Sequence, residues 1–233
     1  MPMRKNVLWI CIAVVMLAAC DNEDNDLNKI LLSAQISYLG EPLQVRNGEI
    51  SYALCEEGQH NNLSLYRLTP FHWNGVGHTE VSKGKSYRLV RALTTVPWVE
   101  LQTNDTTFVR DYKGAVIDIK VMPYYMFQQV NIQKEGSHVV AHFIVEDVLG
   151  NSHNKKIEKV GLYLSSGIIV DCQSTNLGKI EYNTIAINQP LTLKLPNNQI
   201  QHNNSNTTTR QYARLGLKVE GIQAMVYSKV FEL

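Results

Sequence analysis

Residues 116–125 read Val-Ile-Asp-Ile-Lys-Val-Met-Pro-Tyr-Tyr, and this stretch decides the fold class and the division of the chain. Its apolar side chains Ile117, Ile119 and Val121 alternate with polar ones, which is the period of a β-strand with one buried face. The strand runs straight into a proline, which has no backbone N–H to donate to a sheet. The sequence therefore predicts a strand that ends at this proline.

The Met122-Pro123 pair also predicts a domain boundary, because a proline restricts the residue before it and turns the chain in a new direction. Two domains of about 100 residues suit a chain of 233. We therefore predict an N-terminal domain at residues 30–122 and a C-terminal domain at residues 123–233.

The same alternation recurs on both sides of this boundary, and no stretch of helical period stands out. Turn residues such as Asn47-Gly48 and Gly150-Asn151 separate the runs. Many short strands at this spacing predict an all-β protein of sandwiches or barrels. The clearest predicted strands are residues 31–37, 49–55, 63–68, 86–93, 116–121, 129–133, 138–146, 160–164, 168–172, 191–195, 212–219 and 225–231. The Asn- and Thr-rich segment 197–210 is predicted to be a mobile hairpin tip.

The N-terminus carries a separate pattern, Leu17-Ala18-Ala19-Cys20. It closes an uncharged run that is shorter than the ~20 apolar residues of a transmembrane helix. Small residues directly before a cysteine resemble the lipobox of bacterial lipoproteins. We therefore predict a signal peptide at residues 1–19 and acylation of Cys20, which would anchor the protein to a membrane. The alternative is an ordinary secretory signal that ends near the same cysteine.

An acidic tether at residues 20–29 is predicted to follow, because residues 21–26 read Asp-Asn-Glu-Asp-Asn-Asp. A single aspartate after a lipidated cysteine is an inner-membrane retention cue in some Gram-negative bacteria. A longer acidic run resembles the surface-export signal of Bacteroidetes-type lipoproteins. The sequence favours an outer-membrane protein exposed at the cell surface.

Charge and cysteine content exclude some classes of partner. Loss of the signal peptide lowers the 22 Lys and Arg residues to 20, against 21 Asp and Glu, so the mature chain is almost neutral. Such a chain has no electrostatic footprint for nucleic acid. Cys55 and Cys172 remain in different predicted domains, so we expect two small thiols rather than a disulfide.

Catalytic and cofactor motifs are missing from the sequence. It has no Gly-rich phosphate loop, His-Glu-x-x-His, Cys-x-x-Cys or Gly-x-Ser-x-Gly pattern, and its histidines are scattered. We expect no enzyme, metal or cofactor, and a hydrolase with a cryptic site is the least favoured reading.

Four segments, residues 121–125, 157–165, 212–218 and 227–230, carry a resemblance to a known family. They resemble a Bacteroidetes family of two-domain outer-membrane lipoproteins that is named only as a domain of unknown function. The resemblance implies an N-terminal β-sandwich of the transthyretin or carboxypeptidase-regulatory type and an immunoglobulin-like C-terminal β-sandwich. It also implies genes beside the transporter and glycan-binding lipoprotein of starch-utilisation-type (Sus-like) systems.

Two functions follow as hypotheses. In the first, the protein binds a polysaccharide or assists its uptake, with Trp98, Trp73 and Tyr124 as candidate rings for stacking on sugars. Pro97 suggests that Trp98 stands on a loop or edge with its indole exposed, although ordinary packing is the alternative for each tryptophan. In the second, the protein is an accessory subunit that packs on the transport complex through protein contacts.

A modification site is a further hypothesis. Asp105-Thr106-Thr107 resembles the motif at which Bacteroidetes-type bacteria attach glycans to exported proteins. Thr106 is the residue that would carry the glycan.

Overall fold

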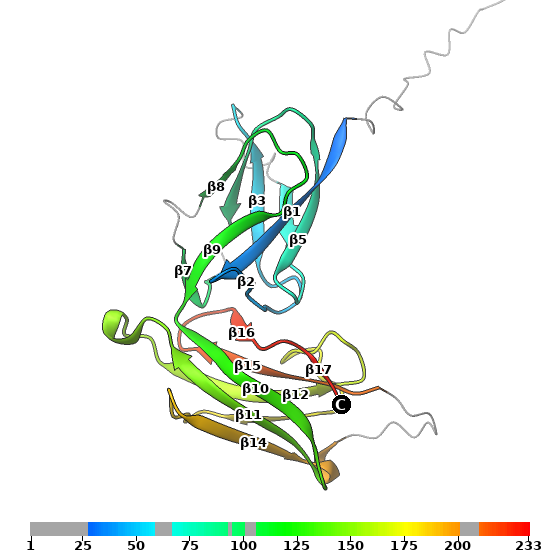
Figure 1. Ribbon diagram of the computed structural model, residues 1–233, viewed down its shortest axis with the longest axis vertical. Helices are drawn as coiled ribbons and strands as arrows, with labels where there is room; N and C mark the ends of the chain where they lie inside the picture. The colour runs from blue at the N-terminus through cyan, green and yellow to red at the C-terminus, as the bar shows by residue number, and fades with distance from the viewer. Residues whose placement is uncertain (1–27, 59–66, 93–94, 101–105, 201–209) are drawn as a thin grey trace, which may run out of the picture.

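The computed structural model describes residues 28–58, 67–92, 95–100, 106–200 and 210–233. These residues form β-strands joined by turns and two short 3-10 segments, and no α-helix occurs among them. The predicted all-β class is confirmed. The strands build two sandwiches stacked end to end (Figure 1).

The N-terminal sandwich packs two sheets face to face. Its strands are β1 (Lys29–Tyr38), β2 (Glu41–Pro42), β3 (Ser51–Glu56), β4 (Arg67–Pro70), β5 (Val76–Ser82), β6 (Tyr87–Arg91), β7 (Trp98–Glu100), β8 (Thr106–Val109) and β9 (Ile117–Pro123). One sheet has the order β2-β1-β9-β7 with β5 also paired to β1, and the other has the order β4-β3-β6-β8. Buried side chains such as Ile36, Tyr52, Leu89 and Ile119 fill the space between the two sheets.

The C-terminal sandwich is built in the same way from the second half of the chain. Its strands are β10 (Tyr125–Glu135), β11 (His138–Asp147), β12 (Ile157–Ser165), β13 (Gly178–Tyr182), β14 (Pro190–Pro196), β15 (Tyr212–Val219), β16 (Met225–Tyr227) and β17 (Phe231–Glu232). The sheet β10-β11-β14 faces the sheet β13-β12-β15-β16, and β17 also pairs with β15. Phe127, Phe143, Leu162 and Leu215 lie in the core between them.

The two sandwiches meet without a linker. Strand β9 ends at Pro123 and β10 begins at Tyr125, so the chain turns at Tyr124, as the proline predicts. The expected alternation on β9 is also present, because Ile119 and Val121 are buried while Asp118 and Lys120 are exposed.

A β-bulge interrupts β10 and changes which of its side chains face inward. Gln128 pairs with Ile144 and Asn131 with His142, so two residues of β10 oppose one residue of β11. Gln129 sits in this bulge with a φ of 51°. The buried positions on β10 therefore change from Tyr125 and Phe127 before the bulge to Ile132 after it.

Most predicted strands are confirmed, but the prediction of a strand at residues 168–172 is wrong. They form a loop, because the Asp171 carboxylate accepts the backbone N–H groups of Gln173 and Ser174 at 2.8 and 2.7 Å and closes a turn. The predicted strand at 225–231 is broken into β16 and β17. Residues 63–66 of the strand predicted at 63–68 lie outside the described residues. Strands β2, β5, β7, β8 and β13 were not predicted from the sequence.

Other predictions fall partly or wholly outside the described residues. The hairpin tip expected at 197–210 begins instead with a 3-10 turn at Asn197–Gln199, and Ile200 packs in the C-terminal core. Residues 201–209 lie outside the described residues, as do the signal peptide, Cys20 and the tether up to residue 27. No disulfide joins Cys55 and Cys172, as expected.

Candidate functional site

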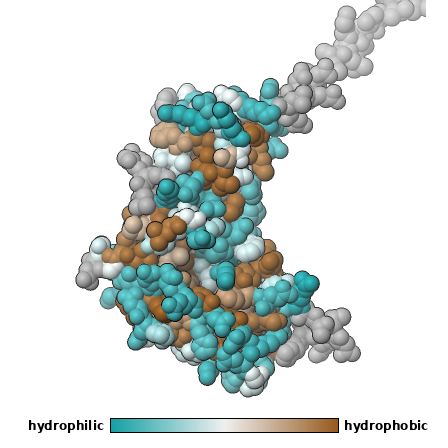
Figure 2. All heavy atoms as spheres, in the orientation of Figure 1, coloured by the Kyte–Doolittle hydropathy of each residue, from teal (hydrophilic) through white to brown (hydrophobic). Residues whose placement is uncertain are grey.

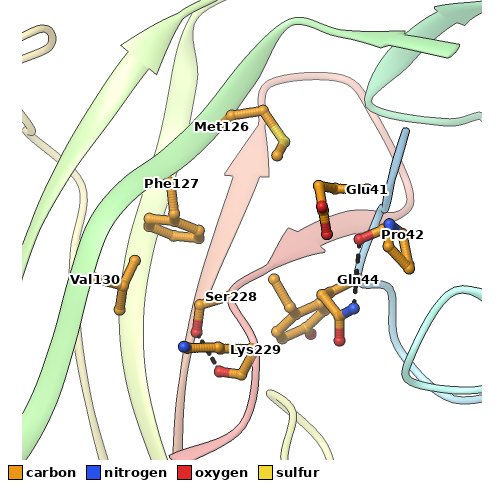
Figure 3. A pocket seen from close by; sticks show the side chains of 9 residues that line it. Glu41, Pro42, Gln44, Met126, Phe127, Val130, Ser228 and Lys229 are labelled. Atoms are coloured by element: carbon orange, nitrogen blue, oxygen red, sulfur yellow. Dashed lines mark hydrogen bonds between the residues drawn. The ribbon is translucent and has the colours of Figure 1, made fainter. Parts of the chain in front are cut away.

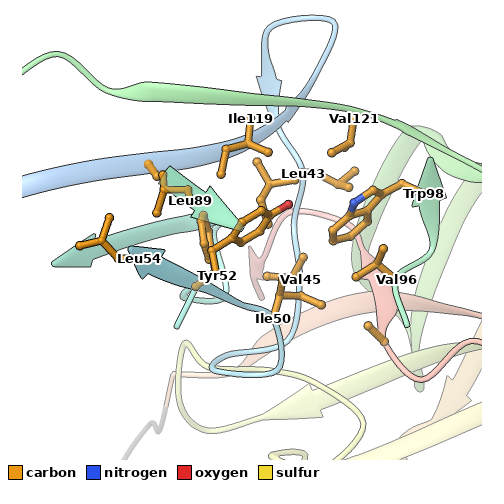
Figure 4. Close-up of a cluster of buried hydrophobic side chains, with 14 of the residues drawn as sticks. Leu43, Val45, Ile50, Tyr52, Leu54, Leu89, Val96, Trp98, Ile119 and Val121 are labelled. Carbon is orange, nitrogen blue, oxygen red and sulfur yellow. The ribbon is translucent and has the colours of Figure 1, made fainter. Parts of the chain in front are cut away.

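The prediction that Trp98 is exposed is wrong. Its side chain is 3% exposed and lies in the N-terminal core beside Val96 and Val121 (Figure 4). Trp98 pairs with Pro123 on β9, and alternation along β7 turns the indole inward and the next residue, Val99, outward. Trp98 therefore contributes to packing and presents no ring to a ligand.

Trp73 lies at the seam between the two sandwiches and is half-buried. Its backbone carbonyl accepts hydrogen bonds from the N–H of Val45 at 3.3 Å and from Nη2 of Arg214 at 2.8 Å. Its ring centre lies 5.9 Å from the Arg214 guanidinium. The position of Trp73 is thus set by contacts within the protein.

Tyr124 is half-buried at the turn between β9 and β10. Its ring centre lies 5.2 Å from the ring of His153 and 6.0 Å from Nζ of Lys155. Because Trp98 is buried, the three predicted aromatic residues do not form one exposed stacking surface.

The His153 side chain beside Tyr124 is engaged at both ring nitrogens. Nε2 lies 2.9 Å from Oδ1 of Asp147, and Nδ1 accepts the backbone N–H of Lys155 at 3.0 Å. The imidazole therefore has no free lone pair to act as a general base. This Asp-His pair holds the loop after β11 in place.

Arg214 on β15 is the central residue of the seam, and it is not among the site residues predicted from the sequence. Its side chain is completely buried and donates to four backbone carbonyls, from both sandwiches. The acceptors are Ser228 at 2.7 Å and Val170 at 3.3 Å in the C-terminal sandwich, and Val45 at 3.2 Å and Trp73 at 2.8 Å in the N-terminal one. Burial lowers the pKa of Arg214 to about 10, so the guanidinium stays charged at neutral pH.

The space for Arg214 and its neighbouring rings depends on two facing glycines. Gly161 on β12 pairs with Gly216 on β15. A Cβ atom on Gly216 would lie 2.7 Å from the Tyr227 ring and 2.9 Å from the Tyr163 ring. The available sequence signal was an arginine and, two positions later, a glycine on the same face of a strand whose other face is apolar, at residues 212–219.

Backbone hydrogen bonds extend the seam on either side of Arg214. The N–H of Tyr227 donates to the carbonyl of Gln44 at 3.0 Å, and the N–H of Ala224 donates to that of Thr95 at 3.1 Å. Ala224 and Val226 themselves pack in the N-terminal core. The two sandwiches are therefore joined by directional and apolar contacts together.

A groove opens at this seam, between β10, residues 227–229 and the strand β2 (Figure 3). It encloses about 310 Å³. Met126, Phe127 and Val130 give it an apolar floor, whereas Glu41 and Lys229 add charged groups at its edge. Figure 2 shows that hydrophobic residues also reach the visible surface around the junction. We call this hollow the seam groove.

Two residues that are close in sequence to the lining of the seam groove have a left-handed backbone conformation. Leu39, at the tip of the β1–β2 hairpin, has a φ of 52° and is 86% exposed. Gln129, in the bulge, has a φ of 51° and precedes Val130 of the floor. Non-glycine residues rarely adopt this conformation, and such residues cluster at ligand-binding sites.

The seam groove has fixed polar groups as well. Nε2 of Gln44 donates to the carbonyls of Pro42 and Asn74 at 3.4 and 3.5 Å, and Oγ of Ser228 donates to the carbonyl of Lys229 at 2.8 Å. These contacts hold the side chains in place before any ligand arrives. The arrangement suits a polar molecule with one apolar face.

The described part of the chain contains neither a metal-binding cluster nor a membrane-spanning helix. No group of three or more His, Cys, Asp or Glu side chains there could hold a metal ion. No helix of those residues has the length and apolar character needed to cross a bilayer.

Comparisons with known proteins identify relatives by sequence and by fold. Residues 125–232 match the family model described as a domain of unknown function, DUF3823_C. No curated protein matches the chain. A DUF3823 family protein from Bacteroides ovatus ATCC 8483 is similar with a TM-score of 0.72 and 27% identity, covering 88% of this chain and 97% of that one.

Two further solved structures share the fold. A DUF3823 family protein from Parabacteroides merdae ATCC 43184 has a TM-score of 0.73 and 23% identity, with 88% of this chain and 98% of that one covered. A Bacteroides uniformis ATCC 8492 protein, named as a candidate carbohydrate-binding protein, has a TM-score of 0.66 and 16% identity, with 87% and 97% covered. Residues 125–232 therefore match the DUF3823_C model, and the two-sandwich fold of the chain is similar to that of DUF3823 family proteins of Bacteroides, a family of unknown function.

Proposed function

We propose that this protein is a non-catalytic carbohydrate-binding protein and that the seam groove holds the sugar. The observation that carries the proposal is the composition of the groove, where an apolar floor of Met126, Phe127 and Val130 meets the polar side chains of Glu41, Gln44 and Lys229. Sugars present the same combination, because a pyranose has an apolar face and a rim of hydroxyl groups. The Bacteroides uniformis relative, named for carbohydrate binding, supports this choice of ligand class.

The size and stiffness of the seam groove agree with a short saccharide segment. A volume of about 310 Å³ lies at the lower end of the range of small-molecule sites, ~300–1,000 Å³. Arg214 and the backbone contacts of the seam fix the two sandwiches that form its walls. A preformed site loses little conformational entropy on binding.

The cellular setting is part of the proposal. The lipobox at residues 17–20 and the acidic run at 21–26 support acylation at Cys20 and display on the outer membrane. There the protein would bind a polysaccharide, or assist its uptake, beside a Sus-like transporter pair. The Cys20→Ala variant should lose acyl labelling and membrane partitioning, and unchanged partitioning would refute the anchor.

The binding test uses the mature chain with Cys20→Ala, which keeps the protein soluble. Affinity electrophoresis in gels containing single polysaccharides should show retardation by at least one of them. The double variant Gln44→Ala/Lys229→Ala should bind at least ten times more weakly, which corresponds to about 1.4 kcal/mol. Lys134→Ala is the matched control, because Lys134 is exposed at the far end of β10. Absence of binding across the panel, or equal loss in both variants, would refute the proposal.

A second function, an accessory subunit of the transport complex, is favoured by one observation. Ile168 and Ile169 lie next to each other on the loop after β12 and are 48% and 40% exposed. Neighbouring exposed isoleucines are suited to a protein partner. Ile168→Ser/Ile169→Ser should abolish co-purification with the transporter pair if this function holds, and leave glycan retardation unchanged.

A further inference from the structure

A second surface of the N-terminal sandwich lies on the outer face of the sheet β4-β3-β6-β8. Cys55 on β3 pairs with Arg88 on β6, and Arg88 pairs with Phe108 on β8. Leu89 and Val109, the next residues on β6 and β8, belong to the core, so Arg88 and Phe108 face away from it. Directly opposed residues have Cβ atoms about 5 Å apart, which makes the arginine and the phenylalanine neighbours.

Phe108 carries an exposed aromatic ring on strand β8. Its side chain is 56% exposed, unlike Trp98, which is buried. The Arg110 guanidinium lies 5.4 Å from the ring centre, and Nη2 of Arg110 lies 3.3 Å from Oε1 of Glu57. The positive charge of Arg110 beside the ring is therefore neutralised by Glu57.

Arg88 has no ion-pair partner among the described residues. Its one hydrogen-bond contact there is from Nη2 to Sγ of Cys55, at 3.6 Å, and a thiol is a weak acceptor. The nearby carboxylates are already engaged, because Glu57 pairs with Arg110 and Glu56 pairs with Lys85 at 2.9 Å. A guanidinium with unused donors is thus left next to the exposed ring.

Both groups line a hollow of about 300 Å³, whose other lining residues are Glu57 and Gly58. We propose that this surface, the Arg88 surface, is a second carbohydrate site and that it binds acidic sugars. The sugar ring stacks on Phe108, and its carboxylate or sulfate group accepts hydrogen bonds from the Arg88 guanidinium. The site depends on its own residues and does not require the seam groove to bind.

The test compares three polymers in affinity gels: polygalacturonate, which carries carboxylates, dextran sulfate, which carries sulfate esters, and neutral dextran. The mature Cys20→Ala chain should be retarded by at least one acidic polymer and not by dextran. The polymer that retards it distinguishes a uronate ligand from a sulfated one. No retardation by either acidic polymer, or equal retardation by dextran, would overturn the proposal.

Variants of single residues distinguish specific binding at the Arg88 surface from non-specific attraction of an acidic polymer to positive charge. Arg88→Gln and Phe108→Ala should each weaken binding to the acidic polymer at least tenfold. Arg88→Lys should weaken binding less than Arg88→Gln, because the lysine ammonium keeps the positive charge but cannot form the bidentate hydrogen bonds of a guanidinium. Lys85→Gln removes one exposed cation near the same sheet and should change binding less than twofold.

Two results would contradict the assignment. An equal loss for Lys85→Gln and Arg88→Gln would show that only net charge matters. A loss of acidic-polymer binding in Gln44→Ala/Lys229→Ala, with Arg88→Gln unaffected, would place the ligand in the seam groove instead. Melting temperatures within about 2 °C of the parent protein confirm that each variant is folded.

Discussion

The interiors of the two sandwiches and the seam between them both contain fully buried side chains, but they are held together by different interactions. Within each sandwich, aliphatic and aromatic side chains such as Leu89 and Leu215 pack against one another. At the seam, Arg214 donates to four carbonyls, and Tyr163 and Tyr227 pack over paired glycines. Apolar burial has no preferred direction, whereas hydrogen bonds do. The seam therefore fixes how the two sandwiches are oriented.

Strand β15 contains both kinds of contact in one segment. Ala213, Leu215 and Leu217 face the interior of the C-terminal sandwich, whereas Arg214 and Gly216 face the seam. Neighbouring residues on this strand can thus be used to test the two regions against each other.

The largest effect is expected for Arg214→Ala. It leaves four carbonyls without their donor and opens a cavity, so we expect a loss of about 4 kcal/mol of unfolding free energy. Urea denaturation measures it. Leu215→Ala on the same strand is the control: it should also destabilise, but only Arg214→Ala should increase the radius of gyration in small-angle X-ray scattering. An unchanged radius in both variants would show that apolar contacts alone orient the sandwiches.

Gly216→Ala should cost about 2 kcal/mol, because its Cβ would meet the Tyr227 and Tyr163 rings at 2.7 and 2.9 Å. Thermal unfolding followed by circular dichroism gives the loss. The comparison is Gly167→Ala, where no atom lies within 4 Å of the added Cβ. Equal melting temperatures for the two variants would mean that the rings move aside freely.

Trp98→Phe tests the interior and should cost less than about 1 kcal/mol. The smaller ring loses buried area, but the substitution also removes the buried Nε1–H, which has no hydrogen-bond partner in the described structure. Denaturant unfolding checks the stability, and affinity gels should show unchanged glycan retardation. If the variant were retarded less by glycan while its stability was unchanged, Trp98 would have to contact the ligand, and the prediction would be wrong.

The smallest effect is a pH dependence at the edge of the seam. Burial opposes ionisation of Glu181, but hydrogen bonds from Tyr163 at 2.7 Å and Lys159 at 3.0 Å lower its pKa below the usual 4.5. The resulting stabilisation is present above the unfolded-state pKa and is lost as pH falls through the lowered folded-state value. Tyr163→Phe should therefore flatten the fall in melting temperature between about pH 5 and pH 2. An identical pH profile in both proteins would contradict this role of Tyr163.

The sequence predicted the interiors better than the seam, for a physical reason. Alternation of apolar and polar residues marks one buried face, and that pattern located β1, β9, β11 and β15. Strand β12 is buried on both faces, so alternation cannot show what covers its second face. Short strands such as β7 and β8 contain too few residues for any period to be visible.

The candidate site was predicted less well than the fold. The sequence identified aromatic residues as possible sugar contacts. Whether such a residue is buried depends on how its strand pairs with its neighbour, and the pairing of β7 with β9 directs the Trp98 side chain into the core. The groups that form the seam groove come from β2, β10 and the residues after β16, far apart in the sequence. The signal that was available was Arg214 and Gly216 on one face of β15, opposite the apolar face of Ala213, Leu215 and Leu217, and that face covers the seam beside the groove.

The packing of Ala224 and Val226 in the N-terminal core also bears on the order in which the protein folds. Domains commonly fold as units while the chain is being made, the N-terminal one first. Here the core that begins with Leu32 is completed by residues that are synthesised nearly two hundred positions later. The first half must remain incomplete until β16 has emerged and docked. Formation of the β15–β16 hairpin is therefore the step at which both halves acquire their final stability together.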